Sequence, residues 1–166
     1  MEFDTRKTEI THQELRYARN SLEYDIYILL CILASSKSLH KNEKKFYGLF
    51  MQLMDFEKSE IYNKVFSIAI RVRNFIDNNK LKSESQIVGT IEEQMGEKKP
   101  LTLREACNKI IHSEHINFDI VNAQSHYEHK GIKEFIYVYG KKGKNNWKTT
   151  INLYKFLSHS MESLFV

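Results

Sequence analysis

Three polar residues, each four positions from the next, have side chains that could act on a phosphodiester. They are Arg104, Asn108 and His112. Residues four apart on a helix lie above one another, so the three would form a ladder along one face. A guanidinium stabilises negative charge on a phosphate, and an imidazole exchanges protons near neutral pH. The ladder predicts metal-free phosphodiester chemistry, with these three residues as catalytic candidates and with no cofactor and no metal.

The sequence predicts a helix from Leu103 to about Ser113 that would position the ladder. Thr102 followed three residues later by Glu105 is a capping box, and Pro100 comes just before it. The adjoining apolar face consists of Leu103, Cys107, Ile110 and Ile111. The ladder would therefore lie on the border between core and solvent, where polar side chains reach a ligand while partly shielded from water.

An asparagine followed after three residues by a histidine, late in a helical chain, resembles the RNxxxH motif of the HEPN superfamily. Asn108 and His112 match that motif, whereas Cys107 stands where the family typically has arginine, and the nearest arginine is Arg104. The resemblance implies a small helical bundle that binds RNA, either as a metal-independent RNase or as an inactive relative, in a bacterial conflict, defence or toxin–antitoxin system. In an active protein His112 would exchange the proton of a ribose 2′-hydroxyl, Arg104 would stabilise the phosphorane and Asn108 would orient the phosphate.

Two other interpretations of the same residues remain open. Asn108 and His112 could instead hydrogen-bond neighbouring backbone groups, as partly buried polar side chains commonly do. The chain could also be a protein-interaction module, such as an immunity protein or antitoxin that inhibits a partner enzyme. A basic cleft lined by Arg104 and His112 would favour RNA, and an exposed apolar or acidic patch would favour a protein partner. A homodimer is compatible with both functions.

Basic residues outside the ladder supply candidate contacts to RNA phosphates. The predicted RNA-binding residues are Arg71, Arg73, Lys109, Lys141, Lys142 and Lys144. The net charge of +4 permits a nucleic-acid partner without requiring one. A solvated turn would explain the lysine cluster equally well, and the helix dipole would explain the two arginines near a helix end.

Aromatic residues and histidines provide weaker signals. The aromatic residues that could stack on bases, or pack in the core, are Tyr137, Tyr139 and Trp147. Two His-x-x-His pairs have metal-ligand spacing, namely His112 with His115 and His126 with His129. Because neither pair has a matching cysteine or carboxylate pattern nearby, we expect no bound metal.

Length and composition predict one globular domain over residues 1–166. The chain has 166 residues, is 42% hydrophobic and 28% charged, and contains one proline and six glycines. Cys31 and Cys107 lie in apolar helical patterns, which indicates small core residues in a reducing cytoplasm. The longest apolar stretch, residues 26–34, falls short of the roughly 20 residues that a membrane span needs. We therefore expect a cytoplasmic protein without a membrane partner.

The hydrophobic pattern predicts an α+β fold, mainly an α-helical bundle with a small antiparallel β-sheet or hairpin in its second half. Apolar stripes of helical spacing over residues 15–33, 46–54 and 61–76 predict three antiparallel helices within a bundle of about 11–79. Thr11 and Glu14 form a capping box at its start. In the mixed part, about 80–166, strands are expected at 86–91, 118–121, 134–139 and 147–153, with a last helix from Tyr154 to about Leu164.

Overall fold

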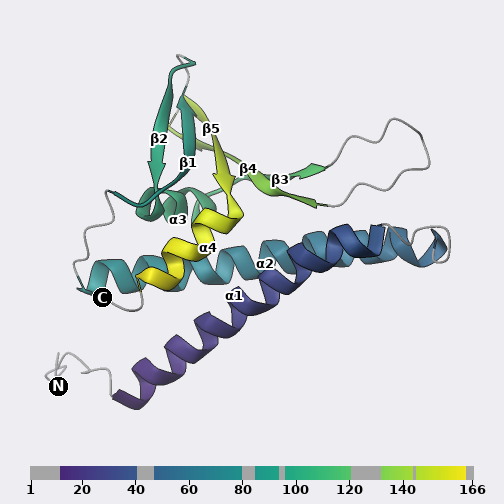
Figure 1. Cartoon of the computed structure of the whole chain (residues 1–166). Coiled ribbons are helices and arrows are strands. Elements are labelled where there is room, and N and C mark those ends of the chain that lie inside the picture. Colours follow the sequence, from purple (N-terminus) through teal and green to yellow (C-terminus); the bar gives the residue numbers. More distant parts are fainter. Residues whose placement is uncertain are drawn as a thin grey trace, which may run out of the picture.

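A hairpin of two long helices lies beside a five-stranded antiparallel sheet that carries two short helices (Figure 1). This computed structural model describes residues 12–40, 47–79, 85–93, 96–120, 132–143 and 145–163. In chain order the elements are α1 (His12–His40), α2 (Tyr47–Asn79), β1 (Ile87–Glu93), β2 (Lys98–Thr102), α3 (Leu103–Ile111), β3 (His115–Ile120), β4 (Ile132–Lys142), β5 (Asn145–Asn152) and α4 (Leu153–Glu162). The predicted α+β class is confirmed, and the sheet is larger than the predicted hairpin.

The helical half consists of one hairpin of two long helices. The expected three-helix bundle is wrong, because residues predicted as the second and third helices belong to the single helix α2. No glycine or proline occurs between residues 55 and 60, so nothing in the backbone chemistry ends the helix there. The predicted cap at Thr11 lies outside the described residues. The buried apolar residues described on the two helices are Leu22, Ile26, Leu29 and Leu33 on α1, and Ile61, Val65, Ile68, Ala69, Val72 and Ile76 on α2.

A buried carboxylate joins the two long helices. Asp25 of α1 is 6% exposed, accepts a 2.8 Å hydrogen bond from Lys64 and a 3.0 Å bond from the hydroxyl of Ser67, and lies 3.3 Å from Arg71. All three partners belong to α2. A buried charge is tolerated when it is paired and hydrogen-bonded, so this cluster sets how α1 lies on α2.

Replacing Asp25 with alanine is expected to lower the free energy of unfolding by about 2 kcal/mol, because it leaves the cations of Lys64 and Arg71 at the helix interface without their carboxylate. Urea unfolding followed by circular dichroism measures this change. The matched control is Asp55→Ala, an exposed aspartate on α2, which should change stability by less than about 0.5 kcal/mol. Equal effects of the two substitutions would contradict the structural role of Asp25.

The sheet has the order β2-β1-β5-β4-β3, and every neighbouring pair is antiparallel. Strands β1, β3, β4 and β5 occupy the regions expected from the sequence, with ends displaced by a few residues. The sequence did not predict β2, because its lysines and Pro100 are untypical of strands. Proline is tolerated in β2 because this strand lies at an edge of the sheet, where one side of the backbone makes no ladder bonds.

Helices α3 and α4 cover one face of the sheet, and α3 also packs against α2 (Figure 1). Their buried residues, including Cys107 and Phe156, join the long helices in one hydrophobic core. Cys107 is a core residue as predicted, but Cys31 is exposed on α1, which corrects the expectation that both are buried. Within the described residues, no helix has an apolar run long enough to cross a bilayer.

Candidate functional site

Helix α3 begins at the predicted capping box. The hydroxyl oxygen of Thr102 accepts a 3.3 Å hydrogen bond from the backbone N–H of Glu105, and the Glu105 carboxylate accepts a 3.2 Å bond from the backbone N–H of Thr102. The helix ends at Ile111, with His112 as its C-cap. This start point sets the direction in which each side chain of α3 projects, so it determines where the ladder lies.

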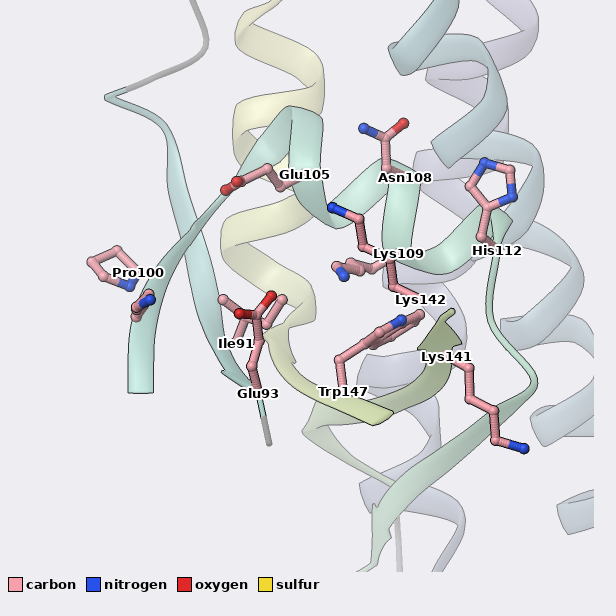
Figure 2. A pocket seen from close by; sticks show the side chains of 11 residues that line it. Ile91, Glu93, Pro100, Glu105, Asn108, Lys109, His112, Lys141, Lys142 and Trp147 are labelled. Carbon is pink, nitrogen blue, oxygen red and sulfur yellow. The ribbon is translucent and has the colours of Figure 1, made fainter. Parts of the chain in front are cut away.

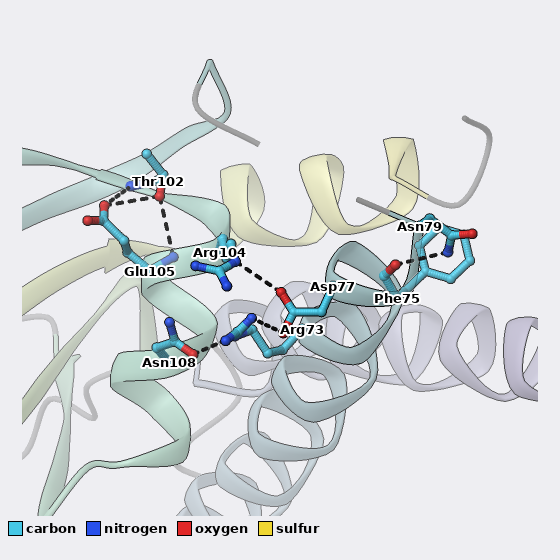
Figure 3. A network of polar contacts seen from close by, with 8 residues as sticks. All are labelled: Arg73, Phe75, Asp77, Asn79, Thr102, Arg104, Glu105 and Asn108. Atoms are coloured by element: carbon cyan, nitrogen blue, oxygen red, sulfur yellow. Dashed lines mark hydrogen bonds and ion pairs between the residues drawn. The ribbon is translucent and has the colours of Figure 1, made fainter. Parts of the chain in front are cut away.

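A chain of hydrogen bonds ties the first two residues of the ladder to α2 (Figure 3). The Nε of Arg104 donates a 3.0 Å hydrogen bond to Asp77, and the Nε of Arg73 donates a 2.6 Å bond to the side-chain oxygen of Asn108. Arg73 also pairs with Asp77, so one carboxylate bridges two guanidinium groups. This network docks α3 antiparallel to the end of α2.

The network also determines what Asn108 can offer to a ligand. Because Arg73 donates to its side-chain oxygen, the amide nitrogen of Asn108 is left as the free end of the side chain. That nitrogen carries two N–H donors. Asn108 also lines the cavity described below, so Arg73 orients it as a hydrogen-bond donor toward that cavity.

The charge on Asp77 gives the network a pH dependence. Desolvation raises the pKa of Asp77, but the hydrogen bond from Arg104 and the charges of Arg73 and Arg104 outweigh it, so the pKa lies below its ordinary value of 3.8. A carboxylate with a lowered pKa in the folded state stabilises the fold above its unfolded pKa, and that stabilisation is lost as the pH falls through the folded pKa.

We therefore expect the Asp77→Asn variant to melt at a lower temperature than the wild type at pH 7, because a neutral asparagine cannot form ion pairs with Arg73 and Arg104. The difference should narrow as the pH falls below 3.8 and vanish once the wild-type carboxylate is protonated. Melting curves of both proteins across this pH range measure it. A difference that stays constant down to the lowest pH would show that the charge of Asp77 is not what stabilises the fold.

A cavity of about 690 Å³ opens between α3 and the sheet (Figure 2). Strands β1 and β2, helix α3, and strands β4 and β5 all contribute to its wall. The lining residues are Ile91, Glu93, Lys99, Pro100, Glu105, Asn108, Lys109, His112, Lys141, Lys142 and Trp147. Four of them are lysines and two are glutamates, so the cavity carries an excess of positive charge before His112 is counted.

Lys109 and Trp147 form the floor of this cavity. The Nζ of Lys109 lies 4.2 Å from the centre of the Trp147 ring, and Trp147 is only 6% exposed. The ring lies across Gly140 of β4, where a β-carbon would come within 2.8 Å of the ring atom Cε2. Glycine at this position therefore makes room for the indole, which in turn supports the ammonium group of Lys109.

The environment of Lys109 disfavours its charged form. Burial lowers the pKa of Lys109, and the charge of Lys142 lowers it further, while the carboxylates of Glu93 and Glu105 raise it. The net effect is a lowered pKa, so the ammonium group is less well stabilised here than in water. A phosphate placed between Lys109 and Lys142 would stabilise both charges.

The structure brings together five of the predicted site residues and separates the others. The five that line the cavity are Asn108, His112, Lys109, Lys141 and Lys142. Arg104 and Arg73 lie beside the cavity in the Asp77 network and do not line it. Arg71 is elsewhere, because it donates a 2.6 Å hydrogen bond to Ser21 and pairs with Asp25. Lys144 lies outside the described residues.

The cavity differs from the site expected from the sequence in three respects. Of the Arg104–Asn108–His112 ladder only Asn108 and His112 line the cavity, whereas the guanidinium group of Arg104 donates to Asp77. The lining residues Lys99 and Glu93 were missed, because they come from the β1–β2 hairpin, half of which was not predicted. Trp147 has its ring covered by Lys109, so it offers no free face for a base in this structure.

Tyr137 and Tyr139 are not part of the cavity. They pair with residues 150 and 148 of β5, which places them on the face of the sheet opposite Trp147, and Lys148 lies 5.2 Å and 5.8 Å from their ring centres. No group of three or more His, Cys, Asp or Glu side chains that could hold a metal ion occurs among the residues described above. His126 and His129 lie outside them, so the absence of a metal stays a prediction.

Comparison with known proteins found no matching family model, no matching curated protein and no matching solved structure.

Proposed function

We propose that this chain is an HEPN-like RNA-binding protein of a bacterial conflict, defence or toxin–antitoxin system, and that single-stranded RNA occupies the cavity between α3 and the sheet. The observation that carries the proposal is the gathering of four lysines with Asn108 and His112 around one opening. Lysines that neutralise phosphates release condensed counterions, which drives binding without regard to sequence. The Asn108 and His112 spacing supports the assignment to the HEPN superfamily.

The same arrangement supports RNA cleavage with His112 as the proton-transfer group. His112 would remove the proton of a ribose 2′-hydroxyl, the 2′-oxygen would attack the adjacent phosphorus, and the 5′-oxygen would leave with a proton from the imidazolium. Lys109 and Lys142 line the cavity together with His112, so they replace Arg104 as the cations that stabilise the phosphorane. Asn108 would donate a hydrogen bond to a phosphate oxygen.

A titration with a uridine oligonucleotide at low salt tests RNA binding. Trp147 is the only tryptophan of the chain and lies in the cavity floor, so its fluorescence reports binding at this site. We expect a change in emission whose midpoint moves to higher RNA concentration as salt is added. A wild-type protein that does not bind RNA at low salt would refute the proposal.

His112→Ala is expected to abolish RNA cleavage while leaving RNA affinity and the melting temperature nearly unchanged. The side chain is exposed and makes no hydrogen bond to the described residues, so its removal leaves little cavity behind. Gel analysis of a labelled oligonucleotide and paired melting curves measure the two effects. Cleavage that persists in the variant would exclude His112 as the proton-transfer group, and a lowered melting temperature would indicate a structural role.

A protein-interaction module, such as an immunity protein or antitoxin, is the second candidate function. It is favoured by aromatic residues on the outer surface of the helical hairpin, since Tyr24 and Tyr27 of α1 and Phe56 of α2 are 60%, 62% and 68% exposed. Such exposure of large apolar side chains is common at protein interfaces. Failure of the wild-type chain to bind RNA would favour this alternative.

A further inference from the structure

A second, smaller hollow of about 250 Å³ adjoins the cavity. Its lining residues are Glu93, Lys142, Asn145, Asn146 and Trp147, and three of these, Glu93, Lys142 and Trp147, also line the cavity. Because the two openings share these side chains, a ligand in one lies next to a ligand in the other. These three residues therefore lie where the two openings meet.

The register of three strands creates this hollow. Trp147 of β5 pairs with Glu93 of β1 on one side and with Gly140 of β4 on the other, while Asn145 pairs with Lys142. Directly opposite residues of antiparallel strands project from the same face of a sheet, and so do residues two apart on one strand. The carboxylate, the amide and the ammonium group therefore gather on the face that carries α3.

The hydrogen-bonding groups of the hollow differ from those of the cavity. The larger cavity has four lysines and two glutamates, whereas the hollow has one glutamate, one lysine and two asparagines around an indole. Within the described part of the chain, the side chains of Glu93, Asn145 and Asn146 make no hydrogen bond. They are therefore available to a polar ligand. An ionised carboxylate can only accept hydrogen bonds, whereas an amide side chain can both donate and accept them.

Among the nucleobases, guanine matches this set best. Its Watson–Crick edge presents two adjacent donors, N1–H and N2–H, beside the acceptor O6. A carboxylate accepts from both donors at once, and an amide N–H can donate to O6. Uracil presents a single donor between two acceptor oxygens, which a carboxylate repels. Unpaired bases of single-stranded RNA are commonly read through hydrogen bonds to this edge.

We propose that the hollow is a guanine-binding subsite, in which Glu93 accepts hydrogen bonds from N1 and N2, the amide of Asn145 donates to O6, and Lys142 binds the adjoining phosphate. This inference rests on the proposed function, because the phosphates of the same RNA would occupy the neighbouring cavity. It adds a base preference to a site whose other contacts recognise only the RNA backbone.

Three hexamers in which one position is varied test the subsite: a uridine hexamer, the same hexamer with one central guanosine, and the same with inosine, which lacks only the N2 amino group. Binding is measured by fluorescence anisotropy of a 5′ dye. We expect the guanosine hexamer to bind the wild-type protein about tenfold more tightly than the uridine hexamer, with inosine in between, as is typical of a bidentate base contact.

Glu93→Gln should remove this preference, because an amide cannot accept from both donors. Its loss of negative charge would strengthen binding of every hexamer, so the ratio of affinities is the quantity compared. Glu97→Gln is the matched control, because this substitution removes the same charge. Glu97 lies just before β2 and lines neither opening. It should leave the guanosine preference intact. Melting curves verify that both variants are folded.

The outcomes separate the two proposals. Equal binding of the three hexamers by the wild type, or a guanosine preference that survives Glu93→Gln, would overturn the guanine subsite while leaving RNA binding in place. Failure of all three hexamers to bind at low salt would overturn the proposed function and the subsite together.

Discussion

Replacing Gly89 with alanine is expected to lower the free energy of unfolding by about 3 kcal/mol. Gly89 lies at an irregularity in the pairing of β1 with β2, and it pairs with Ile151 of the central strand β5. A β-carbon at this position would overlap the backbone carbonyl oxygen of Thr150. Backbone atoms of a paired strand cannot move aside as a flexible side chain can, so β1 must separate from β5. Urea unfolding followed by circular dichroism measures the loss.

Thr90→Ala provides the control, because Thr90 is the next residue of β1 and is exposed on the opposite face of the sheet. Loss of the threonine side chain should lower the free energy of unfolding by no more than about 1 kcal/mol, which is the range spanned by the strand propensities of different residues. Folded Gly89→Ala protein should also show altered Trp147 fluorescence, since Glu93 on the same strand pairs with Trp147. A stability loss at Gly89 no larger than at Thr90 would contradict the close approach of β1 and β5.

Removing two cavity lysines together, Lys109→Gln with Lys142→Gln, is expected to weaken binding of a uridine oligonucleotide about 100-fold at low salt. A charge-assisted contact to phosphate contributes about 1.5 kcal/mol or more, and each 1.4 kcal/mol corresponds to about tenfold in affinity. The slope of log affinity against log salt concentration should also become shallower by about 1.4, because two fewer phosphates of a single strand are neutralised. Titrations at several salt concentrations measure both quantities.

The matched control removes the same charge away from the cavity, by Lys148→Gln with Lys155→Gln. Lys148 lies near the tyrosines on the opposite face of the sheet, and Lys155 is exposed on α4. Affinity should fall far less than in the cavity variant. If both double variants lose the same affinity, RNA is attracted by the net charge of the protein and the cavity is not the binding site.

Much of the fold could be predicted because the relevant signals are contained in short segments. Thr102 and Glu105 alone locate the start of α3, and the reciprocal hydrogen bonds confirm it. Alternating patterns likewise located β4 and β5. The continuity of α2 could not be predicted, because the polar stretch over residues 55–60 is equally compatible with a turn and with the exposed part of a long helix. Strand β2 was missed because an edge position tolerates residues that strands otherwise avoid.

The candidate site was predictable only in part. The helical spacing placed Asn108 on α3, where it is half-buried, whereas His112 is the exposed C-cap just beyond the helix; the cavity includes both. The same spacing suggested that Arg104 shares their ligand. In the structure Arg104 does not line the cavity, and its guanidinium group donates instead to Asp77, which is 27 residues earlier in the chain. No pattern within the helix contains information about a carboxylate on another element.

The sequence by itself determined the α+β class, the cap and register of α3, and the alternation that separates the two faces of β4 and β5. These properties depend on contacts between residues at most a few positions apart, which a single sequence displays directly. Only the tertiary structure decided which residues meet at the cavity and its adjoining hollow. Glu93, Lys109, Lys142 and Trp147 come from four different elements, and their proximity depends on strand order and on how α3 packs over the sheet. Those arrangements are set by burial of the whole core, to which every element contributes, so no single segment encodes them.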